Sequence, residues 1–193
     1  MLRITEGEHR GRKLMVPAVT ATRPLVERAR VGMFNHLRGL IVGATVWDVY
    51  AGSGILGLEA LSRGADRVLA VEQSAKAVAQ LQENARLLGL EGRVRVLRAD
   101  AHRLLAMLVP DAADAAPDLL FFDPPYADFA EGGPRRKRVW ELFCTLAGRL
   151  QPGGVGVAHT PRGILLTEET ERLPGIEQRD YGSTSLYWWH RPE

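Results

Sequence analysis

The sequence predicts an α/β fold: a Rossmann-like, seven-stranded, mostly parallel sheet with helices on both faces. From about residue 44, short apolar segments alternate with amphipathic ones, and this alternation builds a parallel sheet covered on both sides. Residues 176–190 have the composition of two strands joined near Gly182, which predicts a C-terminal antiparallel hairpin. Residues 3–17 predict a separate, small N-terminal β-hairpin.

The individual elements follow from the spacing of apolar residues. Strands are predicted, in chain order, at 45–50, 67–72, 93–100, 118–122 and 155–160. Helices are predicted at 25–40, 54–64, 74–90, 101–109 and 139–150. Ser74 is the expected N-cap of the clearest amphipathic helix, because its hydroxyl can accept a hydrogen bond from the first turn. We expect two units, an N-terminal hairpin and helix at 1–40 and the α/β domain at 41–193.

Composition excludes several classes of protein. The 193 residues are 46% hydrophobic and 25% charged, which is ordinary for a soluble globular chain. No apolar run approaches the roughly 18 residues of a membrane span, and the N-terminus lacks the apolar core of a signal peptide. A single cysteine, Cys144, cannot form an internal disulfide. We therefore expect a cytoplasmic chain with no membrane partner.

Positive charge is unevenly distributed along the chain. Residues 1–40 carry eight Lys and Arg against three Asp and Glu, whereas residues 41–193 carry 17 against 20. A second basic cluster occupies residues 135–138. Each cluster alone is as compatible with a solvated loop or helix start as with binding of a nucleic acid. Two such clusters near one site favour a nucleic acid partner.

A glycine motif lies between the first strand and first helix of the α/β domain. Gly52, Gly54 and Gly57 form G-x-G-x-x-G, and Glu72 ends the next strand. Such glycines permit a tight turn and close approach by a ligand, and the acid can bind ribose hydroxyls. The motif alone fits a nicotinamide dinucleotide, S-adenosylmethionine (SAM) or a merely structural turn.

Three further features favour SAM. Asp48 lies inside the first strand, where a carboxylate can accept from a ligand amine. Asp100 closes the third strand, where it either reaches an adenine amine or caps the next helix. The sequence DPPY closes the fourth strand, and the carboxyl ends of strands form the edge where open α/β sheets bind ligands.

The stretch LLFFDPPYADF, residues 119–129, ends a buried strand in an acid, two prolines and a tyrosine. Pro124 and Pro125 offer no N–H, and each holds the preceding residue extended. The turn therefore exposes acceptors, chiefly the Asp123 carboxylate, beside the ring of Tyr126. This combination suits a planar nucleobase bearing an exocyclic amine and predicts methyl transfer to that amine.

With these motifs the sequence resembles class I SAM-dependent methyltransferases that modify exocyclic amines. More closely, it is similar to the bacterial 16S ribosomal RNA guanine-N2 methyltransferase family of the small subunit. The resemblance runs over nearly the whole chain and includes RITEGEHRGRKLMVP, TRPLVERARVGMFN, DVYAGSGILGLEALSRGA and FFDPPY.

The resemblance implies roles for individual residues. The implied cofactor site comprises Asp48, Tyr50, Gly52, Ser53, Gly54, Glu72, Gln73, Asp100 and Ala101. Within it, Asp48, Gly52 and Gly54 would line the methionine end of SAM, Glu72 the ribose, and Asp100 with Ala101 the adenine. The catalytic residues at the target guanine would be Asp123, Pro124, Pro125 and Tyr126. Residues expected to contact RNA, or in part to order the site, are Arg10, Arg12, Lys13, Arg23, Arg28, Arg30, Arg135, Arg136, Lys137 and Arg138.

The expected activity is methyl transfer from SAM to the N2 amine of a guanine in 16S rRNA, with naked RNA or the small ribosomal subunit as partner. The alternatives are an adenine-N6 DNA methyltransferase, a nicotinamide-binding oxidoreductase and a non-catalytic RNA-binding module. A protein glutamine methyltransferase ranks lower because such enzymes usually carry Asn in place of Asp123. We expect no metal and a monomer.

Overall fold

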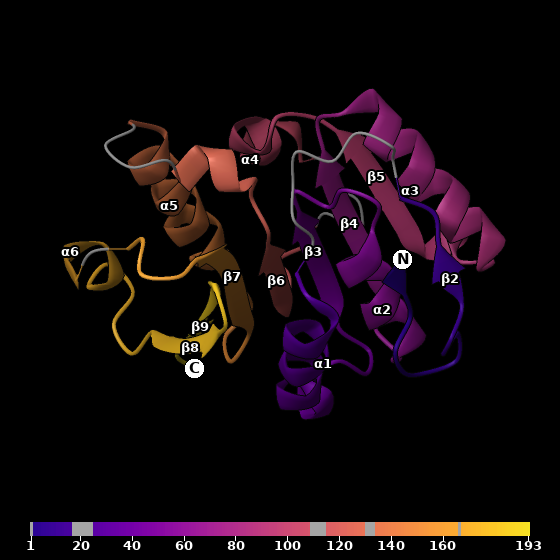
Figure 1. Cartoon of the computed structure of the whole chain (residues 1–193), viewed down its shortest axis with the longest axis horizontal. Coiled ribbons are helices and arrows are strands. Elements are labelled where there is room, and N and C mark those ends of the chain that lie inside the picture. Colours follow the sequence, from indigo (N-terminus) through magenta and orange to yellow (C-terminus); the bar gives the residue numbers. More distant parts are fainter. Residues whose placement is uncertain (1, 17–24, 109–114, 130–133, 166) are drawn as a thin grey trace.

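The computed structural model describes residues 2–16, 25–108, 115–129, 134–165 and 167–193. Within these residues, seven strands form one sheet in the order β5-β4-β3-β6-β7-β9-β8 (Figure 1). The strands are β3 (Thr45–Val49), β4 (Arg67–Glu72), β5 (Val94–Arg98), β6 (Leu119–Phe122), β7 (Val155–Pro161), β8 (Glu177–Tyr181) and β9 (Thr184–His190). Pairs from β5 to β7 are parallel, and β9 pairs antiparallel with β7 and β8. The predicted sheet and its C-terminal hairpin are confirmed.

Helices cover both faces of this sheet. They are α1 (Glu27–His36), α2 (Ile55–Ser62), α3 (Ala75–Leu87), α4 (Leu104–Met107), α5 (Pro134–Ala147) and α6 (Thr167–Thr170). Successive strand residues point to opposite faces, so Val46 packs with α1, α2 and α3, while Trp47 packs with α4 and α5. Across the described residues, no helix has both the length and the apolarity that crossing a bilayer requires.

Most predicted boundaries agree with the structure, and Ser74 caps α3 by accepting from the Ala77 N–H. The helix predicted at 139–150 instead begins at Pro134, so the basic cluster forms its first turns. Proline is favoured at the first position of a helix because its missing N–H needs no partner there. The helix predicted at 25–40 consists of α1 followed, after Leu37, by the 3₁₀ turn η1 (Arg38–Leu40). In the helix predicted at 101–109, the 3₁₀ turn η3 (Ala101–Arg103) precedes α4, which begins at Leu104.

The N-terminal segment forms the predicted small hairpin. Its strands β1 (Leu2–Arg3) and β2 (Lys13–Leu14) pair antiparallel and lie beside α2 and α3 (Figure 1). Ile4 and Leu14 are buried in the same apolar cluster as α1, α2 and the sheet. The hairpin therefore shares its core with the α/β domain.

A buried carboxylate holds the hairpin against α2. Glu59 is fully buried and accepts from the Thr5 N–H, the Thr5 hydroxyl and the Glu6 N–H at 2.8, 2.6 and 3.1 Å. Arg63, one turn later, donates to it at 2.9 Å. Because the charge is surrounded by donors, its burial is compensated.

We expect Glu59→Gln to lower the free energy of unfolding by about 2–4 kcal/mol, because the variant removes the charge and turns an amide N–H₂ toward donors. Urea denaturation measures the loss. The matched control is Glu83→Gln, which breaks the exposed pair with Arg86 and should cost less than about 1 kcal/mol. Equal losses in the two variants would contradict the anchoring role of Glu59.

Candidate active site

The glycine motif forms the turn between β3 and α2. Gly52 and Gly54 have φ of 55° and 83°, in the left-handed region that favours glycine, and Gly54 is the N-cap residue of α2. A Cβ on Gly54 would lie 2.7 Å from Leu81 Cγ, so this glycine allows α3 to pack closely. A Cβ on Gly52 would meet no atom of the described residues within 4 Å. Open space above Gly52 is what close approach by a ligand requires.

Asp48 is buried below this turn. Its Oδ2 accepts from the Gly57 N–H at 2.8 Å, and its buried Oδ1 has no hydrogen-bond partner within the described part of the chain. Burial, and then the charges of Asp123 and Glu72, raise the pKa of Asp48 to about 7. An unpartnered buried acceptor among negative charges fits a ligand ammonium group, such as that of the methionine end of SAM.

Glu72 ends β4 beside the same turn. Its two carboxylate oxygens accept from the Gly52 and Ser74 N–H groups at 3.0 and 2.7 Å. Each oxygen keeps a second lone pair, so the side chain is oriented yet can still accept from ribose hydroxyls. Gln73, between Glu72 and the cap of α3, is exposed.

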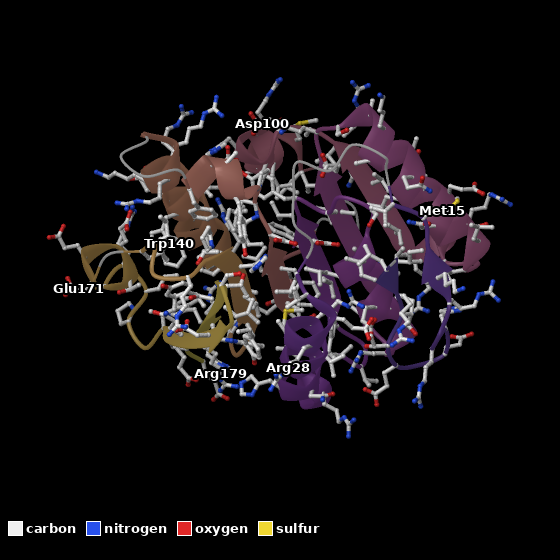
Figure 2. The ribbon with its side chains drawn as sticks, in the orientation of Figure 1. Met15, Arg28, Asp100, Trp140, Glu171 and Arg179 are labelled. Carbon is white, nitrogen blue, oxygen red and sulfur yellow. The ribbon has the colours of Figure 1, made fainter. Side chains whose placement is uncertain are left out.

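Asp100 follows β5 and caps η3, because its Oδ1 accepts from the His102 N–H at 3.0 Å. The capping alternative is thus present in the structure, and an additional adenine contact by the exposed side chain stays a prediction. Ala101 is buried in the apolar cluster under α4 and α5. Figure 2 places Asp100 and Arg28 on opposite sides of the molecule.

Tyr50, the residue after β3, adopts an uncommon backbone conformation. Its φ of 65° is positive although it is not glycine, which costs about 1–3 kcal/mol and points to a functional constraint. Its ring meets Phe122 edge-on at 5.2 Å, and burial, followed by nearby carboxylates, raises its pKa. Ser53, next to Gly54, is also buried.

The DPPY turn follows β6, immediately beside the glycine turn. Val49 and Phe122 are paired, and the Asp123 N–H donates to the Val49 carbonyl at 3.2 Å. Asp123 is 20% exposed, and its Oδ1 lies 2.6 Å from His159 Nδ1. The structure therefore brings the predicted acceptor to the predicted cofactor turn.

The remaining DPPY residues complete one side of the site. Pro124 is buried and Pro125 half-buried, and the chain continues into η5 (Tyr126–Phe129). The Tyr126 hydroxyl lies 3.1 Å from His159 Nε2 and 2.5 Å from Thr184 Oγ1. Sequence reasoning missed His159 and Thr184; the available signal was a histidine inside the apolar strand VGVAHT.

The basic cluster of α5 lies close to this turn. Arg135 is exposed and its guanidinium is 3.7 Å from Asp128 of η5. Arg136 instead turns inward, donating to the Ile164 carbonyl at 3.1 Å and pairing with Glu169 at 3.3 Å. Lys137 and Arg138 are exposed, so three of the four cations remain at the surface.

The N-terminal cations differ in exposure. Arg10, Arg12, Lys13 and Arg28 are exposed, and Arg12 also donates to the Leu87 carbonyl at 3.2 Å. Arg30 is fully buried, with its guanidinium donating to the Arg3 carbonyl at 2.8 Å. Arg30 was expected to contact RNA or to order the site. Its burial rules out contact with RNA in this structure, and its side chain supports the hairpin instead. Arg23 lies outside the described residues.

Asn84 of α3, which sequence reasoning also missed, connects the N-terminal segment to the glycine turn. The side chain is fully buried. It accepts from the Met15 N–H and donates to the Met15 carbonyl, both at 2.9 Å, and donates to the Ser53 carbonyl at 3.0 Å. One amide thus fixes two segments far apart in the sequence.

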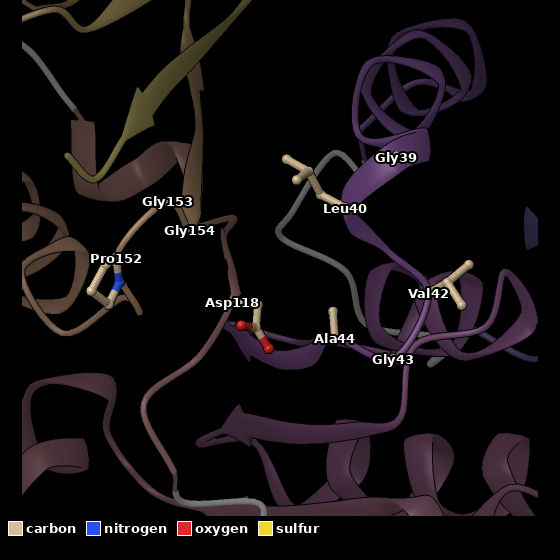
Figure 3. A pocket seen from close by; sticks show the side chains of 9 residues that line it. All are labelled: Gly39, Leu40, Val42, Gly43, Ala44, Asp118, Pro152, Gly153 and Gly154. Atoms are coloured by element: carbon tan, nitrogen blue, oxygen red, sulfur yellow. The ribbon is translucent and has the colours of Figure 1, made fainter. Parts of the chain in front are cut away.

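A cavity of about 350 Å³ lies at the opposite, amino-terminal edge of the sheet (Figure 3). It is lined by Asp118, Ala44 and Gly154, which precede β6, β3 and β7. Asp118 Oδ2 accepts from the Thr45 N–H at 2.8 Å. The Asp118 carboxylate thus binds the backbone at the amino-terminal ends of the strands, at the edge opposite the DPPY turn.

Together, the sheet order, the glycine turn and the adjacent DPPY turn define a Rossmann-like, SAM-dependent methyltransferase. The chain belongs to the family described as Conserved hypothetical protein 95, whose model matches residues 2–190.

Named relatives agree with this class. The chain is 30% identical over 188 residues to "Putative rRNA methyltransferase YlbH" of Bacillus subtilis, covering 96% of each chain. It is 39% identical over 125 residues to "Ribosomal RNA small subunit methyltransferase D" of Escherichia coli K12, covering 65% of this chain and 60% of the relative. Among solved structures, "Putative methyltransferase yhhF" of Escherichia coli is 29% identical with a TM-score of 0.76, over 99% of this chain and 98% of that one.

The raised pKa of Asp48 predicts pH-dependent binding of SAM. The carboxyl is mostly neutral below about pH 7 and mostly ionised above it. An ammonium group favours the ionised form, so the Kd for SAM should rise about tenfold between pH 8 and pH 6. Calorimetric titration across this range checks the effect. Asp48→Asn should bind more weakly at pH 8 and show no such slope; a flat wild-type profile would contradict the role of Asp48.

Replacing Asn84 should weaken both the fold and the cofactor turn. We expect Asn84→Leu to lower the free energy of unfolding by about 2–4 kcal/mol, because it leaves backbone partners unpaired. The Kd for SAM should also rise, since the Ser53 carbonyl loses its donor. Denaturation and calorimetry measure the two effects. Gln82→Leu on the same helix is the control; SAM affinity unchanged in stably folded Asn84→Leu would refute the coupling.

Proposed function

We propose that the chain transfers a methyl group from SAM to the exocyclic N2 amine of a guanine in 16S ribosomal RNA. The observation that carries this proposal is the place of Asp123, at the end of β6 and beside the glycine turn. Its Oδ1 is held by His159, and its Oδ2 has no hydrogen-bond partner among the residues that the structure describes. A partly exposed carboxylate oxygen at this position can accept an N–H of the target amine.

The residues of the DPPY turn would orient the amine. When bound, SAM supplies an electrophilic methyl group. Asp123 accepts an amine N–H, which directs the nitrogen lone pair and stabilises the positive charge that develops during transfer. The two prolines leave carbonyl acceptors and no competing N–H, and the half-buried ring of Tyr126 provides a face for stacking. Orientation of this kind can supply about 7–11 kcal/mol of the barrier.

Ribosomal RNA is the partner that the surroundings of the site support. Exposed Arg135, Lys137 and Arg138 follow the DPPY turn, and Arg10 and Lys13 lie on the N-terminal hairpin. Cations on these elements can contact phosphates on either side of a flipped base. Two relatives carry rRNA methyltransferase in their names. We accordingly propose that residues 1–40 are an RNA-facing extension. We also propose that the protein works as a monomer.

The proposal is tested with labelled SAM and four substrates: under-methylated small subunits, naked 16S RNA, large-subunit RNA and duplex DNA. Digestion and identification of the product nucleoside reveal the methylated atom. N2-methylguanosine in 16S RNA is the expected product. N6-methyladenine in DNA would replace the proposal by its nearest alternative, and binding of NAD without SAM would overturn both.

Asp123→Ala should retain SAM binding and lose methyl transfer by about 10²–10³-fold, because the amine loses its acceptor. Calorimetry measures binding, and initial rates measure transfer. Asp128→Ala, which removes a carboxylate from the following 3₁₀ helix, is the matched control and should stay near wild type. An Asp123→Ala variant with wild-type kcat would refute the role of Asp123.

A further inference from the structure

His159 lies at the centre of the substrate side of the site. It belongs to β7, its side chain is 4% exposed, and its ring contacts residues from the turn after β6, from η5 and from β9. Nδ1 is 2.6 Å from Asp123 Oδ1, and Nε2 is 3.1 Å from the Tyr126 hydroxyl. One imidazole therefore touches both the acceptor and the aromatic ring assigned to the target base.

The contacts determine which ring nitrogen carries hydrogen. An ionised carboxylate can only accept, so the short contact with Asp123 requires hydrogen on Nδ1. In the neutral ring, Nε2 is then an acceptor. The groups that face Nε2 are the hydroxyls of Tyr126 and Thr184, and either can donate to it.

The surroundings hold the ring in this orientation. Thr184 begins β9, is buried, and its hydroxyl also reaches the Thr160 carbonyl at 3.2 Å. The rings of His159 and Tyr126 are tilted against each other with centroids 5.4 Å apart. Backbone pairing of β7 with β6 and β9 fixes where these groups meet.

We propose that His159 is a positioning residue for methyl transfer. Its Nδ1–H holds Oδ1 of Asp123, which leaves Oδ2 directed to the amine. Its Nε2 holds the Tyr126 hydroxyl, which sets the plane on which the base stacks. The inference rests on the proposed function, since it assigns His159 to the methyl-accepting side of that site. A misplacement of about 1 Å at such a site can cost 10²-fold in rate.

The test compares two substitutions of His159. His159→Leu removes both hydrogen bonds, whereas the amide nitrogen of His159→Asn can stand near the position of Nδ1 and donate to Asp123. His190→Asn, an exposed histidine on β9, is the control. We expect His159→Leu to lower kcat on the RNA substrate about 10–100-fold with an unchanged Kd for SAM. The kcat of His159→Asn should be at least threefold higher than that of His159→Leu, and the control variant should match wild type.

The position of the hydrogen on the His159 ring gives a second measurement, which needs no substrate. Nitrogen-15 NMR of the imidazole should show His159 with hydrogen on Nδ1 in the wild type and a shifted tautomer balance in Asp123→Ala. Folded His159→Leu with kcat within twofold of wild type, His159→Asn no better than Leu, or a wild-type ring protonated on Nε2 alone would each overturn the positioning role. A wild type that methylates none of the substrates would instead overturn the proposed function, and this role with it.

Discussion

The adjacency of β3 and β6 in the middle of the sheet is the constraint on which the rest of the site depends. From β3 the strand order runs outward through β4 and β5 and then returns to β6 on the other side. At such a switch point the two following loops diverge, which leaves a crevice at the carboxyl ends of the strands. The pairing of Val49 with Phe122 therefore places the glycine turn and the DPPY turn side by side. A shift of either strand by one residue would turn Asp48 and Asp123 away from each other.

Unfavourable features are concentrated at this one edge. Burial and the charges of Asp123 and Glu72 raise the pKa of Asp48, and Tyr50 adopts a positive φ. Backbone N–H groups or an imidazole hold each of the three carboxylates. The two apolar clusters on either face of the sheet provide the stability that tolerates this arrangement. A ligand that brings positive charge to the edge relieves the repulsion, so the free site is organised for a cationic cofactor.

The sequence predicted what periodic patterns and local motifs encode. Strand alternation located the sheet, and the glycine and DPPY motifs located both turns, because neighbouring residues determine these features. Asn84 and His159 were not predicted because their hydrogen-bond partners are distant in the sequence. Asn84 is 69 residues from Met15, and His159 is 36 residues from Asp123. A single polar residue in an apolar segment does not reveal such a partner. The resemblance implied that Arg30 contacts RNA or orders the site; only the structure shows that its side chain is buried and donates to the Arg3 carbonyl.

The antiparallel β9 is the last part of the site along the chain. The glycine turn, Glu72 and Asp100 come from one continuous half of the α/β domain, whereas Thr184 follows Tyr126 by 58 residues. A nascent chain emerging from the ribosome can form its cofactor-side turns while the hydroxyl that faces His159 is still in the exit tunnel. The substrate side closes only after β9 has inserted next to β7. On the roles proposed for these residues, a newly made chain would complete its cofactor side before its base side.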